Sequence, residues 1–459
     1  VTPTRIGGDW YDGGQFREFY MHSWTAQTNT LKDSWSAASS AIGTCNATID
    51  RLENSTLLSD AEKKQAVASI RGVRAFWIYV MMDNWGNIPL VTSYQDKELP
   101  SVKPRQEVFN WLIQEVNEIA NNCPEASSDT YGKFTQGAAY TLLAKLLLNA
   151  EAWKVTYSGN AYQDCVAACE KVMGMGYILE PNWKTNFSLN NNTSREAIFA
   201  ICFSDQDTEN QNQMMNRTLH YADNLSENAN YAAWNGICAQ PEYVKLFINN
   251  FQDSDNTNKN SDPRLHKTFR IGERRNITTN EMLFTGQNNP LIYSVDVKII
   301  DGTERDGTPW GDVVQEAGAR CQKWDYAPGL TNAMGNHFHI FRLADVYLMK
   351  AEALLRSGNA GEATGLVNEV RKRAYENSAD YQPISTATLE NVLLERRLEL
   401  AWEGWSRQDD IRFGVFEKGM WPDSNCNRKT DEYLKIYPIS QDAWQTNQNI
   451  VQNPGYPSF

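Results

Sequence analysis

The chain lacks long apolar runs and catalytic signature motifs, and it has only five histidines in 459 residues. A membrane-spanning helix needs about 18 or more consecutive apolar residues, and the longest candidate, residues 75–82, ends at Asp83. No His-Glu-x-x-His motif, Walker loop or Gly-x-Ser-x-Gly elbow occurs. The chain therefore shows none of the sequence signatures of helical membrane proteins, zinc proteases, P-loop nucleotide hydrolases or α/β-hydrolases.

An excess of positive charge is also missing. Lysine and arginine number 43 against 56 aspartates and glutamates, for a formal net charge of −13. Nucleic-acid binding needs clustered basic side chains that neutralise phosphates, and here the basic residues are scattered among acids. We therefore expect an acidic surface and no nucleic-acid partner.

Metal-binding patterns are weak. Cys165 and Cys169 lie four residues apart, but no Cys-x-x-Cys pair or nearby histidine accompanies them. His337 and His339 have strand spacing without a third ligand nearby, and residues 253–257 begin like a calcium loop but lack its glycine and closing glutamate. We expect buried free thiols, structural histidines, and neither a metal nor another cofactor.

What the sequence does contain is amphipathic helical patterning in its first and last thirds. Apolar stripes at helical spacing, the Ser59–Glu62 capping box, Pro104 at a first helical position and Gly358 after a last turn mark the helix ends. The predicted helices cover residues 29–52, 60–85, 104–119, 136–153, 160–173, 341–357, 360–374 and 386–402.

The middle of the chain differs, because helical periodicity gives way to Asn, Asp, Thr, Gly and Trp. Two alternating stretches there, residues 197–203 and 291–300, predict short strands. We expect a mostly α fold in one domain. Its parts are helical hairpins in 28–175, an irregular ligand-facing region in 176–340, and C-terminal helical hairpins with a tail in 341–459, within the single domain 1–459.

One helical pair has the order of signals of a tetratricopeptide repeat. Residues 343–374 read as a helix, a Gly-Asn turn and a second helix that carries alanines where close approach is needed, at about the repeat length expected. Residues 142–175 show the same order around Gly159 and Asn160. Ordinary antiparallel helix hairpins remain the alternative.

Six ordered blocks along the chain resemble one known family. They are Arg5–Gly14; Arg71–Trp77 with Trp85–Val91; Lys103–Arg105; Arg342–Ala353; Glu395–Leu400 with Tyr437–Ile439; and Gln452–Tyr456. Together they resemble the SusD-like, or RagB, outer-membrane lipoproteins of Bacteroidetes.

The resemblance implies a SusD-like, tetratricopeptide-like helical fold in a surface-exposed lipoprotein of the cell outer membrane. It further implies a lipid anchor on an N-terminal cysteine and a partner, a SusC-like TonB-dependent transporter over which the protein sits as a lid. The first cysteine here, Cys45, falls inside a predicted helix. We therefore expect the lipidated cysteine upstream of Val1.

The charged blocks are expected to be scaffold. Arg342 and Asp345 have the i, i+3 spacing of a pair on a helix surface. Glu395 and Glu399 could in principle serve as the two carboxylates of a glycoside hydrolase. On one helix face, however, they point the same way, with arginines between them. We expect an ion-pair network and no enzymatic activity.

The aromatic content, 15 Trp, 20 Tyr and 17 Phe, indicates the binding chemistry. Aromatic planes cover the C–H face of a sugar ring, while carboxylates, amides and arginines bind its hydroxyls. Trp10 lies in a glycine-rich segment between Asp9 and Asp12. The family's glycan sites use a tryptophan from this loop, so the resemblance points to Trp10, with Asp9 and Arg5; packing of Trp10 against a helix is the alternative.

The irregular middle should supply the second half of the platform. Its candidate aromatics are Tyr293, Trp310 and Trp324, together with Tyr231, Trp234 and Tyr326. We expect Trp10 and Trp310 to form an aromatic arc that binds an oligosaccharide or polysaccharide for delivery to the transporter. Capture of peptides or glycopeptides, as RagB-like members perform, is a second possibility, and glycoside hydrolysis is a third.

Overall fold

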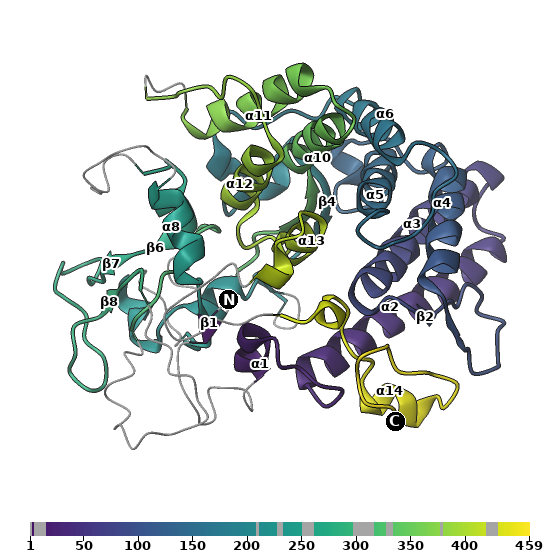
Figure 1. The fold of residues 1–459 in the computed structure, drawn as a ribbon, viewed down its shortest axis with the longest axis horizontal. Helices are drawn as coiled ribbons and strands as arrows, with labels where there is room; N and C mark the ends of the chain where they lie inside the picture. Colours follow the sequence, from purple (N-terminus) through teal and green to yellow (C-terminus); the bar gives the residue numbers. More distant parts are fainter. Residues whose placement is uncertain are drawn as a thin grey trace.

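The computed structural model describes residues 2–3, 15–207, 211–226, 233–249, 261–296, 316–326, 334–376, 380–418 and 430–459. Five of the expected ligand-binding residues, Arg5, Asp9, Trp10, Asp12 and Trp310, lie outside these ranges. The described chain is mostly helical with a few short strands, which confirms the predicted fold class (Figure 1). Among the described residues no helix has the length and hydropathy of a membrane span.

The eight predicted helices are present, and the described residues contain six further short helices that were not predicted. Their bounds are α1 Gln15–Met21, α2 Asn29–Glu53, α3 Asp60–Trp85, α4 Arg105–Ala120, α5 Gln136–Asn149, α6 Ala161–Met173, α7 Met214–Thr218, α8 Pro241–Asn249, α9 Leu265–Thr268, α10 Leu343–Arg356, α11 Ala360–Ala374, α12 Leu389–Leu400, α13 Ser406–Arg412 and α14 Gln441–Thr446. The capping box is present, since Ser59 Oγ accepts from Glu62 N and Glu62 Oε2 accepts from Ser59 N.

Some helix ends differ from the prediction for local backbone reasons. Pro104 is the residue before α4 rather than its first residue. Helix α5 ends at Asn149, four residues early, and α12 ends at Leu400 rather than Trp402. The backbone of Trp402 has φ 67°, a left-handed conformation that a right-handed helix excludes.

The two tetratricopeptide-like pairs, distant in sequence, stack on one another. Helix α5 packs against α6 and α10 against α11, while α10 also packs against α6 and α12. Figure 1 shows α10 between α6 and the α11–α12 layer. Small buried side chains line these contacts, among them Ala344, Ala351 and Ala363, so the helix backbones approach closely.

Short two-stranded pairings hold the irregular middle together. The strand pairs, all antiparallel, are β1 Thr2–Pro3 with β5 Ile237–Cys238, β2 Ile88–Pro89 with β3 Val102–Lys103, β4 Ala197–Ile201 with β10 Phe338–Arg342, β6 Phe269–Arg270 with β9 Arg320–Cys321, and β7 Gly272–Glu273 with β8 Ile292–Tyr293. Strands β4 and β8 fall inside the predicted stretches 197–203 and 291–300 and are shorter than them.

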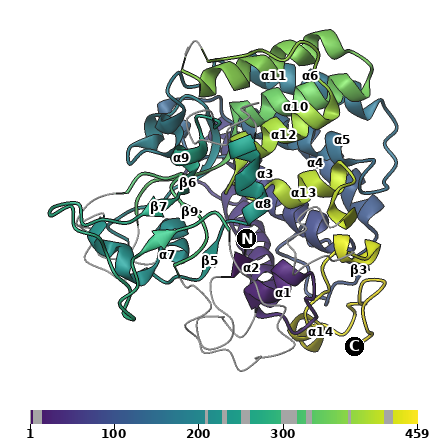
Figure 2. The same cartoon turned by 60° about the vertical axis from the view of Figure 1, so that its left-hand side comes forward.

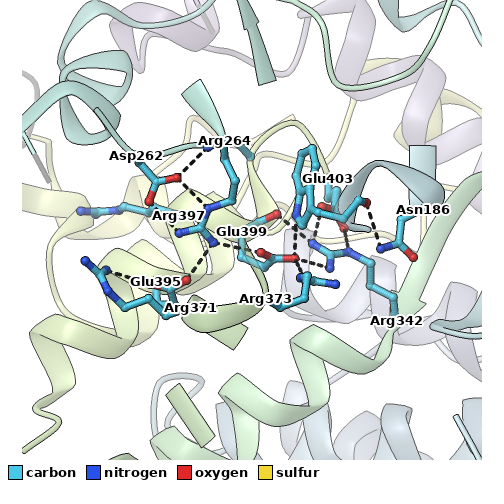
Figure 3. Close-up of polar contacts among 12 residues, drawn as sticks. Asn186, Asp262, Arg264, Arg342, Arg371, Arg373, Glu395, Arg397, Glu399 and Glu403 are labelled. Atoms are coloured by element: carbon cyan, nitrogen blue, oxygen red, sulfur yellow. Dashed lines mark hydrogen bonds and ion pairs between the residues drawn. The ribbon is translucent and has the colours of Figure 1, made fainter. Parts of the chain in front are cut away.

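A buried ion network joins the irregular middle to the C-terminal helices (Figure 3). Glu399 accepts from Arg342 Nη1 at 2.6 Å, from Arg264 Nη1 at 2.9 Å and from Trp183 Nε1 at 3.0 Å. Ion pairs connect five acidic and five basic side chains: Glu196, Asp262, Glu395, Glu399 and Glu403 with Arg264, Lys323, Arg342, Arg371 and Arg373. The expected network is confirmed.

The expected pairing of Arg342 with Asp345 on a helix surface is wrong, because both side chains are buried. Arg342 binds the carboxylates of the network, and Asp345 instead pairs with Lys145 at 2.6 Å and with Arg396 at 2.8 Å. Burial alone would raise the pKa of Asp345, but the charges of Lys145 and Arg396 hold it well below its usual range. Residue spacing along a helix does not fix partners when other helices cover the same face.

Candidate ligand-binding surface

The segment that carries Trp10 begins and ends beside β5. In the β1–β5 pair, Pro3 lies opposite Ile237. At the other end of the segment, the ring of Phe16 lies 3.6 Å from the point where a Cβ on Gly236 would sit. The structure thus positions both flanks of residues 4–14 against one short strand.

The two ends of the segment that carries Trp310 lie close together, and they also lie beside β5. Gly318 N donates to Ser294 Oγ at 3.3 Å, which brings together the residues before and after 297–315. Ala239 N, directly after β5, donates to Ala319 O at 2.8 Å. Figure 2 shows β5, β7 and β9 gathered in one part of the molecule, away from α10 and α11. The two segments therefore leave from neighbouring strands.

Arg320 is the residue that connects these parts, and sequence reasoning missed it. Its buried guanidinium donates to Ala317 O at 2.9 Å and to Thr218 O, the end of α7, at 2.7 Å. The same group donates to Asn235 Oδ1 at 2.6 Å. A lone arginine in an irregular stretch carries no sequence signal of this role, because its acceptors lie as many as 102 residues away.

Trp234 is the one tryptophan with an exposed side chain among the described residues, at 39%. It lies next to Asn235 and two residues before Gly236, so it borders the place where the flanks of the two segments meet at β5. Its backbone N donates to Asn216 O at 2.7 Å, and the guanidinium of Arg217 lies 5.3 Å from its ring centre. An exposed indole with an exposed arginine beside it fits the C–H face and the hydroxyls of a sugar. We call residues 216–217, 234–236 and β5 the Trp234 surface.

Tyr293 and Trp324, which the sequence placed on the platform, lie in the core instead. Tyr293 is fully buried, and its hydroxyl donates to Asp223 Oδ2 at 2.9 Å. Trp324 is 1% exposed and stacks on Phe338 at 5.4 Å between ring centres. Neither ring offers a free face to a ligand. The irregular region needs a core of its own, and these large rings supply it.

The electrostatics of this core stabilise the surface above it. Burial, and next the negative charge of Asp223, raise the pKa of Tyr293 far above its usual value. The phenol therefore remains a hydrogen-bond donor at neutral pH, and the guanidinium of Arg320 lies 4.9 Å from its ring centre. This arrangement supports a binding surface.

The described histidines and cysteines form no metal-binding group of three or more. His337 Nδ1 and His339 Nε2 lie 3.1 Å and 3.0 Å from one hydroxyl, that of Tyr131. The thiols of the described cysteines are free, and six of the seven are buried; Cys202 is exposed, contrary to expectation.

Comparison with known proteins agrees with this architecture. A family model described as the SusD family matches residues 195–456, more than half of the chain. The starch-binding protein SusD of Bacteroides thetaiotaomicron is 25% identical over 483 residues, which cover 97% of this chain and 82% of that protein.

Two solved structures show the same fold. A laminarin-binding SusD-like protein has a TM-score of 0.72 at 22% identity, over 99% of this chain and 92% of its own. Surface glycan-binding protein A from Bacteroides thetaiotaomicron, in complex with laminarihexaose, has a TM-score of 0.66 at 20% identity, over 92% and 85% of the two chains.

Proposed function

Because the chain belongs to the SusD family, we propose that it is a non-catalytic protein of the bacterial cell surface that captures a glycan. The relatives support this class of ligand: one is named as starch-binding, and one solved structure contains a bound laminarihexaose. The captured oligosaccharide passes to a SusC-like TonB-dependent transporter in the outer membrane. A lipid anchor holds the protein at that membrane.

The observation that carries the proposal is the Trp234 surface. An exposed indole lies where the flanks of the Trp10 and Trp310 segments meet on β5. Stacking of sugars on aromatic rings needs such rings on one face with polar groups around them. We propose that Trp10, Trp234 and Trp310 form this face, with Asp9, Asp12 and Arg5 as hydrogen-bonding groups.

Titration calorimetry with oligosaccharides of starch and of laminarin tests the proposal, with Trp10→Ala, Trp234→Ala and Trp310→Ala as variants. Loss of a stacked ring should weaken binding by about 1–3 kcal/mol, since a fully buried aromatic contact contributes this much. Tyr94→Ala is the matched control, because Tyr94 is 51% exposed and has Lys97 Nζ 4.8 Å from its ring centre. If Trp234→Ala binds every glycan as tightly as the wild-type protein does, Trp234 takes no part in glycan binding.

Two outcomes distinguish the alternatives. Binding of peptides without binding of any glycan supports the RagB-like reading. Release of reducing ends during incubation with a polysaccharide establishes a hydrolase. The transporter partnership has its own test: a SusC-like barrel should co-purify with the full lipoprotein from solubilised outer membranes, whether or not glycan is present.

A further inference from the structure

A cleft of about 660 Å³ lies between the start of α5, the end of α6 and β4. Its volume falls within the range of about 300–1,000 Å³ that holds small ligands. Hydroxyls and aromatic rings dominate its lining, which includes Ser127, Thr130, Tyr131, Tyr177, Arg195 and His337. No residue of this β4 cleft belongs to the Trp234 surface, so the two places can be tested separately.

The charge of the cleft is unusual for this chain. Acidic side chains outnumber basic ones by 13 over the whole sequence, yet the lining of the β4 cleft contains no carboxylate and one full positive charge, Arg195. Glu180 accepts from the backbone N of Arg195, at 2.6 Å. The guanidinium itself makes a long contact with Gly176 O at 3.4 Å and no ion pair with the described carboxylates. This cation is available to an anionic ligand.

The Tyr131 hydroxyl links the rings of His337 and His339 beside the cleft. Burial, and then the charge of Arg342, lower the pKa of His339 to about 3, and burial also lowers the pKa of His337. Both rings are therefore neutral at pH 7, and each carries one N–H. The single hydroxyl of Tyr131 thus holds both rings in place.

His337 is the ring of this pair that lines the cleft. Its Nδ1 contacts the Tyr131 hydroxyl, and its Nε2 has no hydrogen-bond partner among the described residues. This nitrogen is therefore the one left for a ligand.

Tyr177 forms an aromatic wall of the cleft, and its position depends on Gly137 in the first turn of α5. A Cβ on Gly137 would lie 2.3 Å from the Tyr177 hydroxyl oxygen, so a larger residue would displace the ring. The hydroxyl lies 3.4 Å from Thr135 Oγ1. The cleft thus combines ring faces, hydroxyls, one cation and one imidazole nitrogen.

We propose that the β4 cleft binds a uronic acid unit of a saccharide. Arg195 binds its carboxylate, the tyrosine rings cover its C–H face, and His337 Nε2 with other polar groups of the lining binds its hydroxyls. A neutral sugar leaves the cation without a partner, whereas a simple anion leaves the rings and hydroxyls unused.

Calorimetric titration of the wild-type protein with methyl β-D-glucuronide, methyl β-D-glucoside and sodium sulfate tests this proposal. The glucuronide should bind at least about 10-fold more tightly than the glucoside, because hydrogen bonds to a charged group are the stronger ones. Arg195→Met should weaken glucuronide binding about 10–100-fold, and His337→Asn should weaken it less. Arg195 is exposed, so its replacement leaves the fold intact.

The variants also separate this site from the proposed glycan surface. Trp234→Ala should leave glucuronide affinity unchanged, and Arg195→Met should leave affinity for a neutral oligosaccharide unchanged. Three results would overturn the proposal: no glucuronide binding, equal affinity for glucuronide and glucoside, or sulfate binding as tight as that of the glucuronide. Glucuronide binding that is lost in Trp234→Ala but kept in Arg195→Met would overturn it as well.

Discussion

Replacement of Glu399 by glutamine tests whether the charged block of α12 is scaffold. In the folded protein this carboxylate is fully buried and receives hydrogen bonds from Arg264, Arg342 and Trp183. Burial alone would raise its pKa, but three guanidinium groups, led by that of Arg373, hold the pKa well below its usual range. Glutamine keeps the shape, removes the charge, and leaves the network of five acids and five bases with a net positive charge.

The expected cost follows from that imbalance. Loss of one partner from a buried ion pair destabilises a protein by about 3–5 kcal/mol, because the remaining charge is neither solvated nor paired. The entropy of unfolding is about 2.1 cal/mol/K per residue, which gives about 1 kcal/mol/K for this chain. The melting temperature of Glu399→Gln should therefore fall by about 3–5 °C.

Differential scanning calorimetry measures this shift, with Glu242→Gln as the matched control. Glu242 pairs with Lys245 at 2.8 Å, but both side chains are about one-third exposed. Loss of such a surface pair costs less than about 1 kcal/mol. The same substitution thus separates the effect of burial from that of the chemical change.

A second measurement separates scaffold from catalysis. If Glu399 is structural, glycan affinity of the variant at 25 °C should match that of the wild type, and neither protein should release reducing ends. An unchanged melting temperature would refute the scaffold role. If the wild type hydrolyses a glycan and the variant does not, Glu399 has a catalytic role and the scaffold interpretation is refuted.

Three further predictions concern pH, packing and the Trp234 surface. His339 has a folded-state pKa of about 3 against 6.5 unfolded, so the folded state binds fewer protons between these values and stability falls as pH drops. From pH 6.5 to 4.5 this loss reaches about 2 kcal/mol, and urea unfolding should show a smaller loss for His339→Gln; equal losses would contradict the assignment. Gly72→Ala should cost about 1–3 kcal/mol, because its Cβ would lie 2.1 Å from Phe134 Cδ1. Gly43→Ala, with nothing within 4 Å of its Cβ, should instead be neutral or stabilising in thermal melts. Arg320→Met should accelerate amide exchange at residues 317–319 and lower glycan affinity, whereas unchanged exchange would show that Arg320 does not hold that loop.

Local sequence determined the helices and the kind of interaction that joins them. Apolar periodicity and caps such as Ser59–Glu62 act within a few residues, so α2 to α6 and α10 to α12 could be predicted close to their observed bounds. The density of charge around Glu395 and Glu399 likewise indicated an ion network, because arginines adjoin both carboxylates in the sequence.

Only the tertiary structure decided which residues are partners and which aromatic rings are exposed. Arg342 binds Glu196, 146 residues away, and Glu403, 61 residues away, rather than Asp345, three residues along the chain. Tyr293 and Trp324 carry the loop surroundings of a sugar platform but fill a second core, while Trp234 remains exposed. Burial of a ring and choice of an ion partner depend on chains that approach from elsewhere in the fold, and no local pattern encodes that approach.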